Sequence, residues 1–371
     1  MYRGGPEKHV GRTDELDHPL QDGLMSARKV AQMTKRRKDE HIHVNLNEDV
    51  RAKGIQSGFE RYRLLHCAAP EINLDEVDTS VELLERKLHS PILISSMTGG
   101  TALAKKINAR LARVAQEHRF AMALGSCRLL LEDDSVLRSF AVRKHAADIL
   151  LFANLGAVQL NYGVSVDDCR KLVDVLEVDA LVLHLNPLQE ALQPEGNTRF
   201  RGVLSRIEDL CRSLHVPIIV KEVGWGISGA VADRLKNVGV FAIDVAGAGG
   251  TSWSEVERVR SLESWQQQCA ASFAGWGIPT AETLVQVRLA APDIVTIASG
   301  GIKSGIDIAK GIALGATLAG IASPFLQTAV QSEKVLHDCA KTFTRELRVA
   351  MFACGCKSLN ELRSSSPLSW V

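Results

Sequence analysis

The sequence predicts an α/β protein, a (β/α)8 barrel of the TIM-barrel type with an N-terminal extension. Three observations support this prediction: eight short apolar runs recur from residue 91 onward, each run is continuously apolar, and helical patterns separate the runs. Continuous apolarity without alternation is typical of parallel strands that are buried on both faces. A strand followed by a helix, repeated eight times, is the pattern of this barrel.

The eight predicted strands begin roughly 25 to 50 residues apart. They are PILISS (from Pro91), FAMALG (Phe120), ILLFANLG (Ile149), ALVLHLN (Ala180), PIIVKEVG (Pro217), FAIDVAG (Phe241), DIVTIASGG (Asp293) and TLAGIAS (Thr317). The segment from Ala102 to Glu117 has the 3.6-residue periodicity of a crossover helix. An open doubly wound sheet is the alternative, but its Gly-x-Gly-x-x-Gly turn is missing from MTGGTALAKK after the first strand.

Residues 1–35 are polar and without sustained periodicity, so we expect a flexible polar extension followed by one barrel domain over residues 36–371. A basic segment at residues 36–45 opens this domain. As a charge run alone, the cluster from Lys35 to Lys38 is best interpreted as a solvated surface, although a role in binding a ligand stays open.

The composition is that of an ordinary globular protein. The 371 residues are 46% apolar and 23% charged with a net charge of +1, which gives no reason to expect a nucleic-acid or membrane partner. No apolar run approaches the roughly 18 residues of a membrane helix. The eight cysteines form no Cys-x-x-Cys pair and no signal peptide is evident, so we expect reduced thiols and a cytoplasmic location.

The active site of such a barrel lies at the carboxyl ends of the strands. The predicted strands end in chemically active residues, which are Ser96 to Gly100, Gly125 to Arg128, Asn154, His184, Asn186, Gln189, Glu190, Lys221, Glu222, Gly247 to Ser252, Ser299 to Lys303, Ala322 and Ser323. Glycine-rich turns after the last strands commonly hold a phosphate, so Gly300, Gly301, Lys303, Ala322 and Ser323 predict a phosphate site. The ligand is either a phosphorylated substrate or FMN.

Single polar residues allow two interpretations each. Lys221 ends a buried strand, and it either faces the anionic edge of a reduced flavin or pairs with a neighbouring carboxylate. Glu190 either holds Mg²⁺ together with substrate phosphates or is a surface glutamate. His184 is a site residue or a hydrogen-bonded core histidine, and Cys127 is more simply a spectator thiol than a nucleophile because no base is placed beside it.

Taken together, the motifs resemble one family, the type 2 isopentenyl-diphosphate isomerases, which are FMN-dependent barrels. The resemblance extends from about Arg37 to the last strand and its helix. Its motifs are RKDEH, SMTGGT, GSCR, HLNPLQE, KEVGWGIS, AGAGGTSW, WGIPTA and SGGIKSGIDIAKGIALGA. The resemblance implies an enzyme of isoprenoid biosynthesis that interconverts isopentenyl and dimethylallyl diphosphate with reduced FMN, Mg²⁺ and NADPH as the flavin reductant.

The resemblance also implies roles for individual residues. His184, Asn186 and Gln189 would form the catalytic group and Glu190 would bind the metal. The substrate would be bound by Arg37, Lys38, His41, Ser126, Arg128 and Gln189. FMN would be held by Met97, Thr98, Gly99, Ser126, Asn154, Lys221, Thr251, Gly300, Gly301, Lys303, Ala322 and Ser323. The sequence departs from the family at Cys127, where Gln or Met is usual, and at Lys303, where Arg is usual.

Two other functions stay open at this point, an FMN oxidoreductase acting on a hydroxy acid or nucleotide and a flavin-binding module without catalysis. The partner is expected to be a small isoprenyl diphosphate. An exposed barrel flank favours self-association, with a homo-oligomer of four or eight chains as the expectation.

Overall fold

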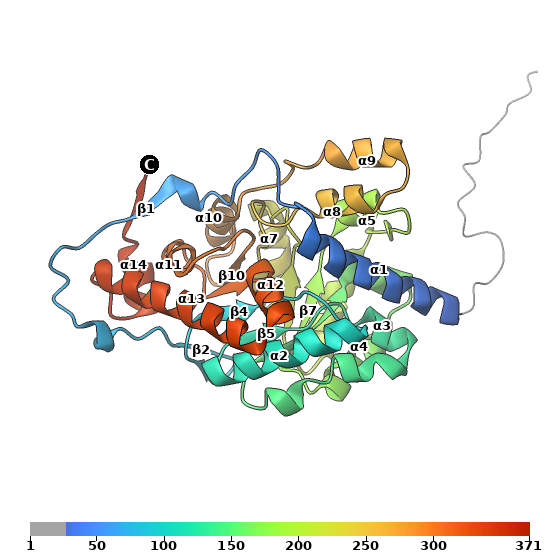
Figure 1. Ribbon diagram of the computed structural model, residues 1–371, viewed down its shortest axis with the longest axis horizontal. Helices are drawn as coiled ribbons and strands as arrows, with labels where there is room; N and C mark the ends of the chain where they lie inside the picture. Colours follow the sequence, from blue (N-terminus) through green and yellow to red (C-terminus); the bar gives the residue numbers. More distant parts are fainter. Residues whose placement is uncertain (1–26) are drawn as a thin grey trace, which may run out of the picture.

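A closed barrel of eight parallel strands forms the centre of the protein, as seen in a computed structural model that describes residues 27–371, with side chains from residue 32 onward (Figure 1). All eight predicted strands are confirmed. They are β4 (Ile92–Ile94), β5 (Ala121–Ala123), β6 (Leu151–Gly156), β7 (Ala180–His184), β8 (Ile218–Lys221), β9 (Ala242–Asp244), β10 (Val295–Ser299) and β11 (Leu318–Ile321).

Each strand pairs with the next in sequence, and β11 returns to pair with β4 in register Ala319 to Ile92. The side chains inside the barrel form one apolar cluster with Leu83 and Leu88, which come from the antiparallel hairpin of β2 (Val81–Leu83) and β3 (Arg86–Leu88). The two hairpin leucines pack in the same cluster as strand residues such as Leu93 of β4. The hairpin therefore closes the amino-terminal end of the barrel. The polar strand ends are left at the opposite end.

Helices surround the barrel, as the sequence predicts. They are α2 (Ala102–His118), α3 (Arg128–Glu132), α4 (Val166–Leu176), α5 (Pro187–Leu192), α6 (Val203–Ser213), α7 (Gly229–Asn237), α8 (Trp253–Arg260), α9 (Ser264–Ala271), α10 (Thr280–Ala290), α11 (Gly305–Ala313), α12 (Ser323–Gln331), α13 (Glu333–Ala353) and α14 (Leu359–Ser365). The crossover helix predicted from Ala102 is α2. It begins after Thr101, whose side chain accepts from the backbone N–H of Ala104, and ends at Arg119 in the left-handed conformation.

The connections depart from a simple strand and helix alternation in two places. Between β5 and β6 the only α-helix is the short α3, followed by 3₁₀ turns at Asp134–Ser139 and Arg143–His145. After β9 the chain forms α8 and α9 before the crossover helix α10. The additional helices α8 and α9 therefore belong to a loop at the carboxyl end of the barrel, where loops carry function.

Helix α1 (Ala27–Asn47) begins before the domain boundary that we expected near residue 35, and it packs against α8 and α3 (Figure 1). The rest of the expected extension, residues 1–26, lies outside the described residues, and the division into extension and domain stays a prediction. Further along the chain, β1 (Tyr62–Leu64) pairs with β12 (Leu368–Trp370) near the C-terminus. The remaining 3₁₀ turns are Phe59–Arg61, Leu74–Glu76 and Ala157–Tyr162.

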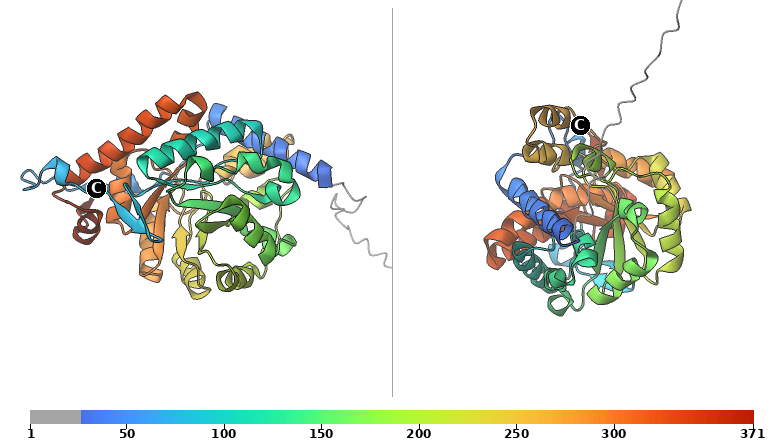
Figure 2. Two further views of the ribbon diagram at one scale, coloured as in Figure 1. Left: turned by 90° about the horizontal axis from the view of Figure 1, so that it is seen from below. Right: turned by 90° about the vertical axis from the view of Figure 1, so that its right-hand side faces the viewer.

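The long C-terminal helix α13 lies beside α2 and α12 on one flank of the barrel (Figure 2). All eight cysteines are free thiols. Within residues 27–371, no helix combines the length and the apolar character that crossing a membrane requires.

Gly305 tests the packing of α11 against α13. A Cβ at this position would lie 2.4 Å from the backbone N of Leu347 and 2.4 Å from the backbone O of Phe343, neither of which can yield easily. We expect Gly305→Ala to lower the free energy of unfolding by roughly 3 kcal/mol, measured by urea denaturation. The control is Ile306→Ala in the same turn, where the side chain is 47% exposed and the change should stay within about 0.5 kcal/mol.

Candidate active site

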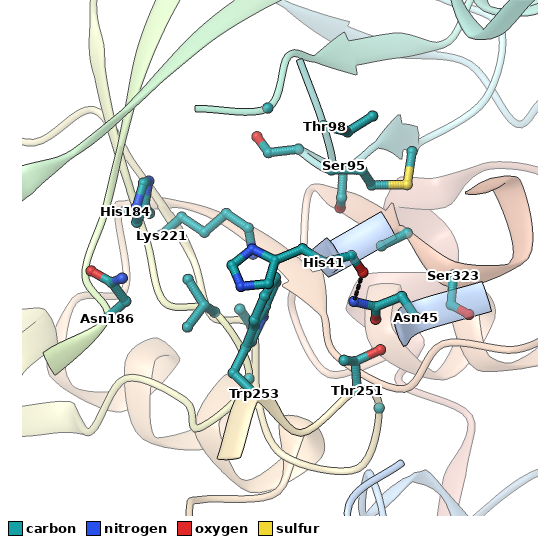
Figure 3. Close-up of a pocket in the computed structure, with 18 of the residues that line it drawn as sticks. His41, Asn45, Ser95, Thr98, His184, Asn186, Lys221, Thr251, Trp253 and Ser323 are labelled. Carbon is teal, nitrogen blue, oxygen red and sulfur yellow. Dashed lines mark hydrogen bonds between the residues drawn. The ribbon is translucent and has the colours of Figure 1, made fainter. Parts of the chain in front are cut away.

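A cavity of about 480 Å³ opens at the carboxyl ends of the barrel strands. Its size falls in the range of small-molecule sites. Every site residue predicted from the sequence lines it, from the strand ends, from the loops that follow them and from α1. Figure 3 shows His41 of α1 in the middle of the view, with His184, Asn186 and Lys221 on one side and Thr251 and Ser323 on the other.

Helix α1 covers part of this cavity through its basic residues. Lys38 Nζ donates to the backbone O of Ser126 at 2.7 Å, and Lys35 Nζ pairs with Asp133 at 2.7 Å. Burial lowers the pKa of Lys38 to about 8. The basic run is therefore only partly a solvated surface: Arg36 is exposed, whereas Lys38 is packed over the strand ends, where an anionic ligand would compensate its charge.

The turn after β7 holds a network of amides and one carboxylate. Asn186 Nδ2 donates to Gln189 Oε1 at 3.1 Å and to Glu190 Oε1 at 2.9 Å. The other oxygen of Glu190 accepts from Gln193 Nε2 at 2.6 Å and from the backbone N–H of Asn197 at 2.5 Å. With only 8% exposure, Glu190 is not the surface glutamate of the alternative interpretation.

Glu257 of α8 is a functional candidate that sequence reasoning missed. Its Oε1 accepts from Gln189 Nε2 at 3.1 Å and lies 3.2 Å from His41 Nε2, while its Oε2 pairs with Arg260 at 2.5 Å. Burial raises its pKa, but the bonds from His41 and the charge of Arg260 outweigh burial, so the net pKa is lowered. One buried carboxylate thus connects α1, α5 and α8.

His184 lies at the end of β7 and is held by a neighbouring strand. Its Nδ1 is 2.9 Å from Asn154 Oδ1, so Nδ1 carries the proton and Nε2 has the lone pair. Burial, helped by the charges of Lys221 and Lys38, lowers the pKa of His184 to about 4. The imidazole is therefore neutral at physiological pH.

Lys221 pairs with a neighbouring carboxylate, as one of its two interpretations predicts, and it also lines the cavity. Its Nζ lies 3.6 Å from Asp244 Oδ2 at the end of β9 and donates to the backbone O of Glu222 at 2.8 Å, yet the side chain also lines the cavity. Asp244 additionally accepts from Ser299 Oγ. The ion pair therefore holds the ammonium group at the cavity wall without removing it from a ligand's reach.

The predicted phosphate turn has the backbone that close approach to a ligand requires. Gly300 and Gly301 have φ of +104° and +73°, conformations that side chains rarely adopt. A Cβ on Gly250 would lie 2.6 Å from the backbone N of Gly301, so two glycine turns touch each other here. Ser323 is the first residue of α12, whose N-terminus is an anion-binding position.

Several buried polar atoms of the cavity lack a partner within the described part of the chain. They are Ser95 Oγ, Thr98 Oγ1 and Asn186 Oδ1. Leaving a buried polar atom unpaired costs roughly 1–3 kcal/mol, which a polar ligand would offset. Cys127 is fully buried and burial raises its pKa to about 11, so it stays a thiol and fits the spectator interpretation.

Similar proteins indicate that this chain is an FMN-dependent enzyme. A family model described as FMN-dependent dehydrogenase matches residues 186–367. An isopentenyl-diphosphate delta-isomerase of Nostoc sp. is 51% identical over 335 residues, which are 90% of this chain and 96% of the relative. The enzymes of the same name from Synechocystis sp. and Rickettsia bellii are 53% and 48% identical, and the matches cover 94% and 96% of their lengths.

Solved structures with the same fold are more distant. A mandelate oxidase with an FMN monooxide adduct has a TM-score of 0.61 and 16% identity, covering 92% of this chain and 98% of its own. An (S)-mandelate dehydrogenase has a TM-score of 0.64 and 16% identity, covering 94% of this chain and 100% of its own. These similarities confirm the predicted barrel and say nothing further about the substrate.

The lowered pKa of His184 predicts a pH dependence of stability. The unfolded imidazole takes up a proton near its ordinary value of about 6.5, whereas the folded one resists protonation down to about 4, so stability falls as pH drops below 6.5. Between pH 7 and 5 we expect the parent protein to lose about 2 kcal/mol more unfolding free energy than His184→Gln, measured by urea denaturation. The exposed control His215→Gln should lose as much as the parent. Equal losses in all three would mean that folded His184 takes up a proton as readily as the unfolded residue does, which would contradict the lowered pKa.

Proposed function

The chain belongs to the isopentenyl-diphosphate delta-isomerase family, and on that premise we propose which of its residues carry out the interconversion of isopentenyl and dimethylallyl diphosphate. The function itself, FMN-dependent isomerisation, follows from relatives about half identical over nearly their whole length. The observation that carries the assignment of residues is the convergence of all predicted site residues on one cavity.

The residues of the cavity fit FMN. The unpaired hydroxyl of Thr98 and the ammonium group of Lys221 are suited to the flavin ring, and Gly300, Gly301 and Ser323 with Lys303 to its phosphate. Met97, Gly99, Ser126, Asn154, Thr251 and Ala322 would complete the cofactor site. Lys303 neutralises a phosphate as a point charge, without the bidentate geometry of arginine.

The substrate diphosphate is assigned to the basic side of the cavity. Arg37, Lys38 and His41 of α1 and Arg128 of α3 line it there, so a polyanion would compensate their buried charge. Mg²⁺ is usually bound by one or two carboxylates together with substrate phosphates. Glu190 fits this role because, within the described residues, its Oε1 accepts a single hydrogen bond and retains a lone pair.

Moving the double bond requires a proton added at one carbon and another removed from an allylic carbon. Bound in its reduced form, FMN supplies the electron-rich ring that these proton transfers need. Neutral His184 would present Nε2 to the substrate without adding charge, and the Gln189 amide, held by Asn186 and Glu257, would orient the alkene. The covering helix α1 would exclude water from the carbocation-like centre.

NADPH is assigned the role of reducing the flavin before turnover. We also expect a cytoplasmic homo-oligomer of four or eight chains. The fold neighbours act on mandelate, but their identity of 16% supports only the shared barrel and gives no specific support for an oxidoreductase.

Anaerobic turnover tests the proposed function. Purified protein with FMN, Mg²⁺ and NADPH should shift isopentenyl diphosphate to an equilibrium mixture while oxidising no more NADPH than reduces the bound flavin once. The products are followed by NMR and NADPH by absorbance. Continuous NADPH oxidation in step with product would instead indicate an oxidoreductase.

Glu190→Gln tests the metal assignment while keeping the shape of the side chain. We expect at least a tenfold rise in the Mg²⁺ concentration needed for half-maximal activity, because the remaining amide oxygen is a neutral ligand. The control Glu208→Gln lies on the exterior helix α6 and should leave the Mg²⁺ requirement unchanged. An unaltered Mg²⁺ requirement in Glu190→Gln would contradict the assignment.

A further inference from the structure

Two helices bring a group of metal-binding side chains together far from the cavity. Glu117 and His118 are the last residues of α2, and His337 lies on α13. Since α2 runs back from the carboxyl end of β4 to the start of β5, this group lies at the amino-terminal end of the barrel, where residues generally serve stability. Within residues 27–371, this is the sole group of three His, Cys, Asp or Glu side chains whose ligand atoms all lie within 4.8 Å of one another.

The two imidazoles already face each other at a distance that suits a shared ion. His118 Nε2 and His337 Nδ1 are 3.2 Å apart. Two nitrogens bound at about 2.0–2.1 Å to one tetrahedral ion lie about 3.3 Å apart. One proton can bridge two nitrogens at this distance, and an ion could take its place with little movement of either ring. The displaced proton would pass to the other nitrogen of His118 or to solvent.

Glu117 prepares His337 for this role. Its Oε2 lies 3.1 Å from His337 Nε2, so this nitrogen carries a proton and the neutral ring presents a lone pair at Nδ1. A carboxylate that accepts from the outer N–H of a metal-bound histidine is a common second partner of such sites. With 62% exposure of its side chain, Glu117 is also free to contact solvent ligands of the ion.

We propose that His118 and His337, supported by Glu117, form a binding site for a divalent transition metal ion such as Zn²⁺ that joins α13 to α2. Imidazole ligands select Zn²⁺, Ni²⁺ or Cu²⁺ over Mg²⁺, which prefers oxygen, so this site differs in chemistry from the one assigned to Glu190. Water completes the coordination.

The surroundings hold His118 in place and keep it available. Its ring packs against Phe120 with centroids 5.2 Å apart, which limits its rotation. His118 is partly exposed, so an ion can reach its ring from solvent. Arg113 donates from Nε to Glu333 Oε1 at 2.9 Å and from Nη2 to Glu333 Oε2 at 2.5 Å, a bidentate pair between the same two helices that keeps α2 and α13 aligned.

Zinc titration of the tag-free holoprotein tests the proposal. In the presence of excess Mg²⁺, calorimetry with ZnCl₂ should detect one Zn²⁺ bound per chain. In His337→Gln this binding should be absent, or its affinity at least tenfold lower. Glu117→Gln should weaken the same binding about tenfold through the loss of its support to His337. His215→Gln, at an exposed histidine elsewhere, is the matched control and should bind as the parent does.

Thermal unfolding gives a second readout that does not depend on activity. Zn²⁺ should raise the unfolding temperature of the parent and of His215→Gln and leave that of His337→Gln unchanged, because only a site in the folded state adds binding free energy. Circular dichroism would verify that each variant is folded. Equal zinc stoichiometry, affinity and thermal shift in the parent and in His337→Gln would overturn the proposal.

Discussion

The hydrogen bonds between β11 and β4 close the barrel, and the site depends on that closure. In an open sheet with the same strand order, β4 and β11 would lie at opposite edges. Closure instead brings Thr98, which follows β4, to the same cavity as Ser323, which follows β11. A cofactor can therefore be contacted from its ring to its phosphate by residues far apart in sequence. The hairpin carrying Leu83 and Leu88 seals the other end, so the cavity opens at one end only.

A balance of buried charge shapes the mouth of the barrel. Lys38 donates to the backbone O of Ser126, Lys221 pairs with the buried Asp244, and Arg260 pairs with the buried Glu257. Glu257 lies at the junction of α1, α5 and α8. Such pairs stabilise little by themselves because desolvation offsets their attraction, but leaving one partner alone is strongly unfavourable. The contacts of Lys38 with Ser126 and of His41 with Glu257 hold α1 against the strand ends and against α8. The diphosphate and the flavin phosphate would then enter a region already positive.

Most of the fold could be predicted because it depends on local patterns. The eight runs are buried on both faces, and α2 carries its own N-cap at Thr101, so neither required knowledge of distant contacts. The exceptions lie in the loops: α3 replaces a full crossover helix, and α8 and α9 are added after β9. Loop conformation depends on what packs beneath it, which strand periodicity does not encode.

The sequence by itself determined the barrel and the residues that gather around one cavity at the strand ends, because in a closed parallel barrel the order along the chain dictates the position around the mouth. Only the tertiary structure decided how these residues are held. In the sequence EVERVR, Glu257 lies among other charged residues in the pattern of a helix exposed to solvent. Its burial between His41 and Gln189 arises because α8 packs against α1, and His41 and Glu257 are 216 residues apart in the chain. Likewise, His118 and His337 face each other only because α13 packs against α2, although most of the barrel sequence lies between these two helices.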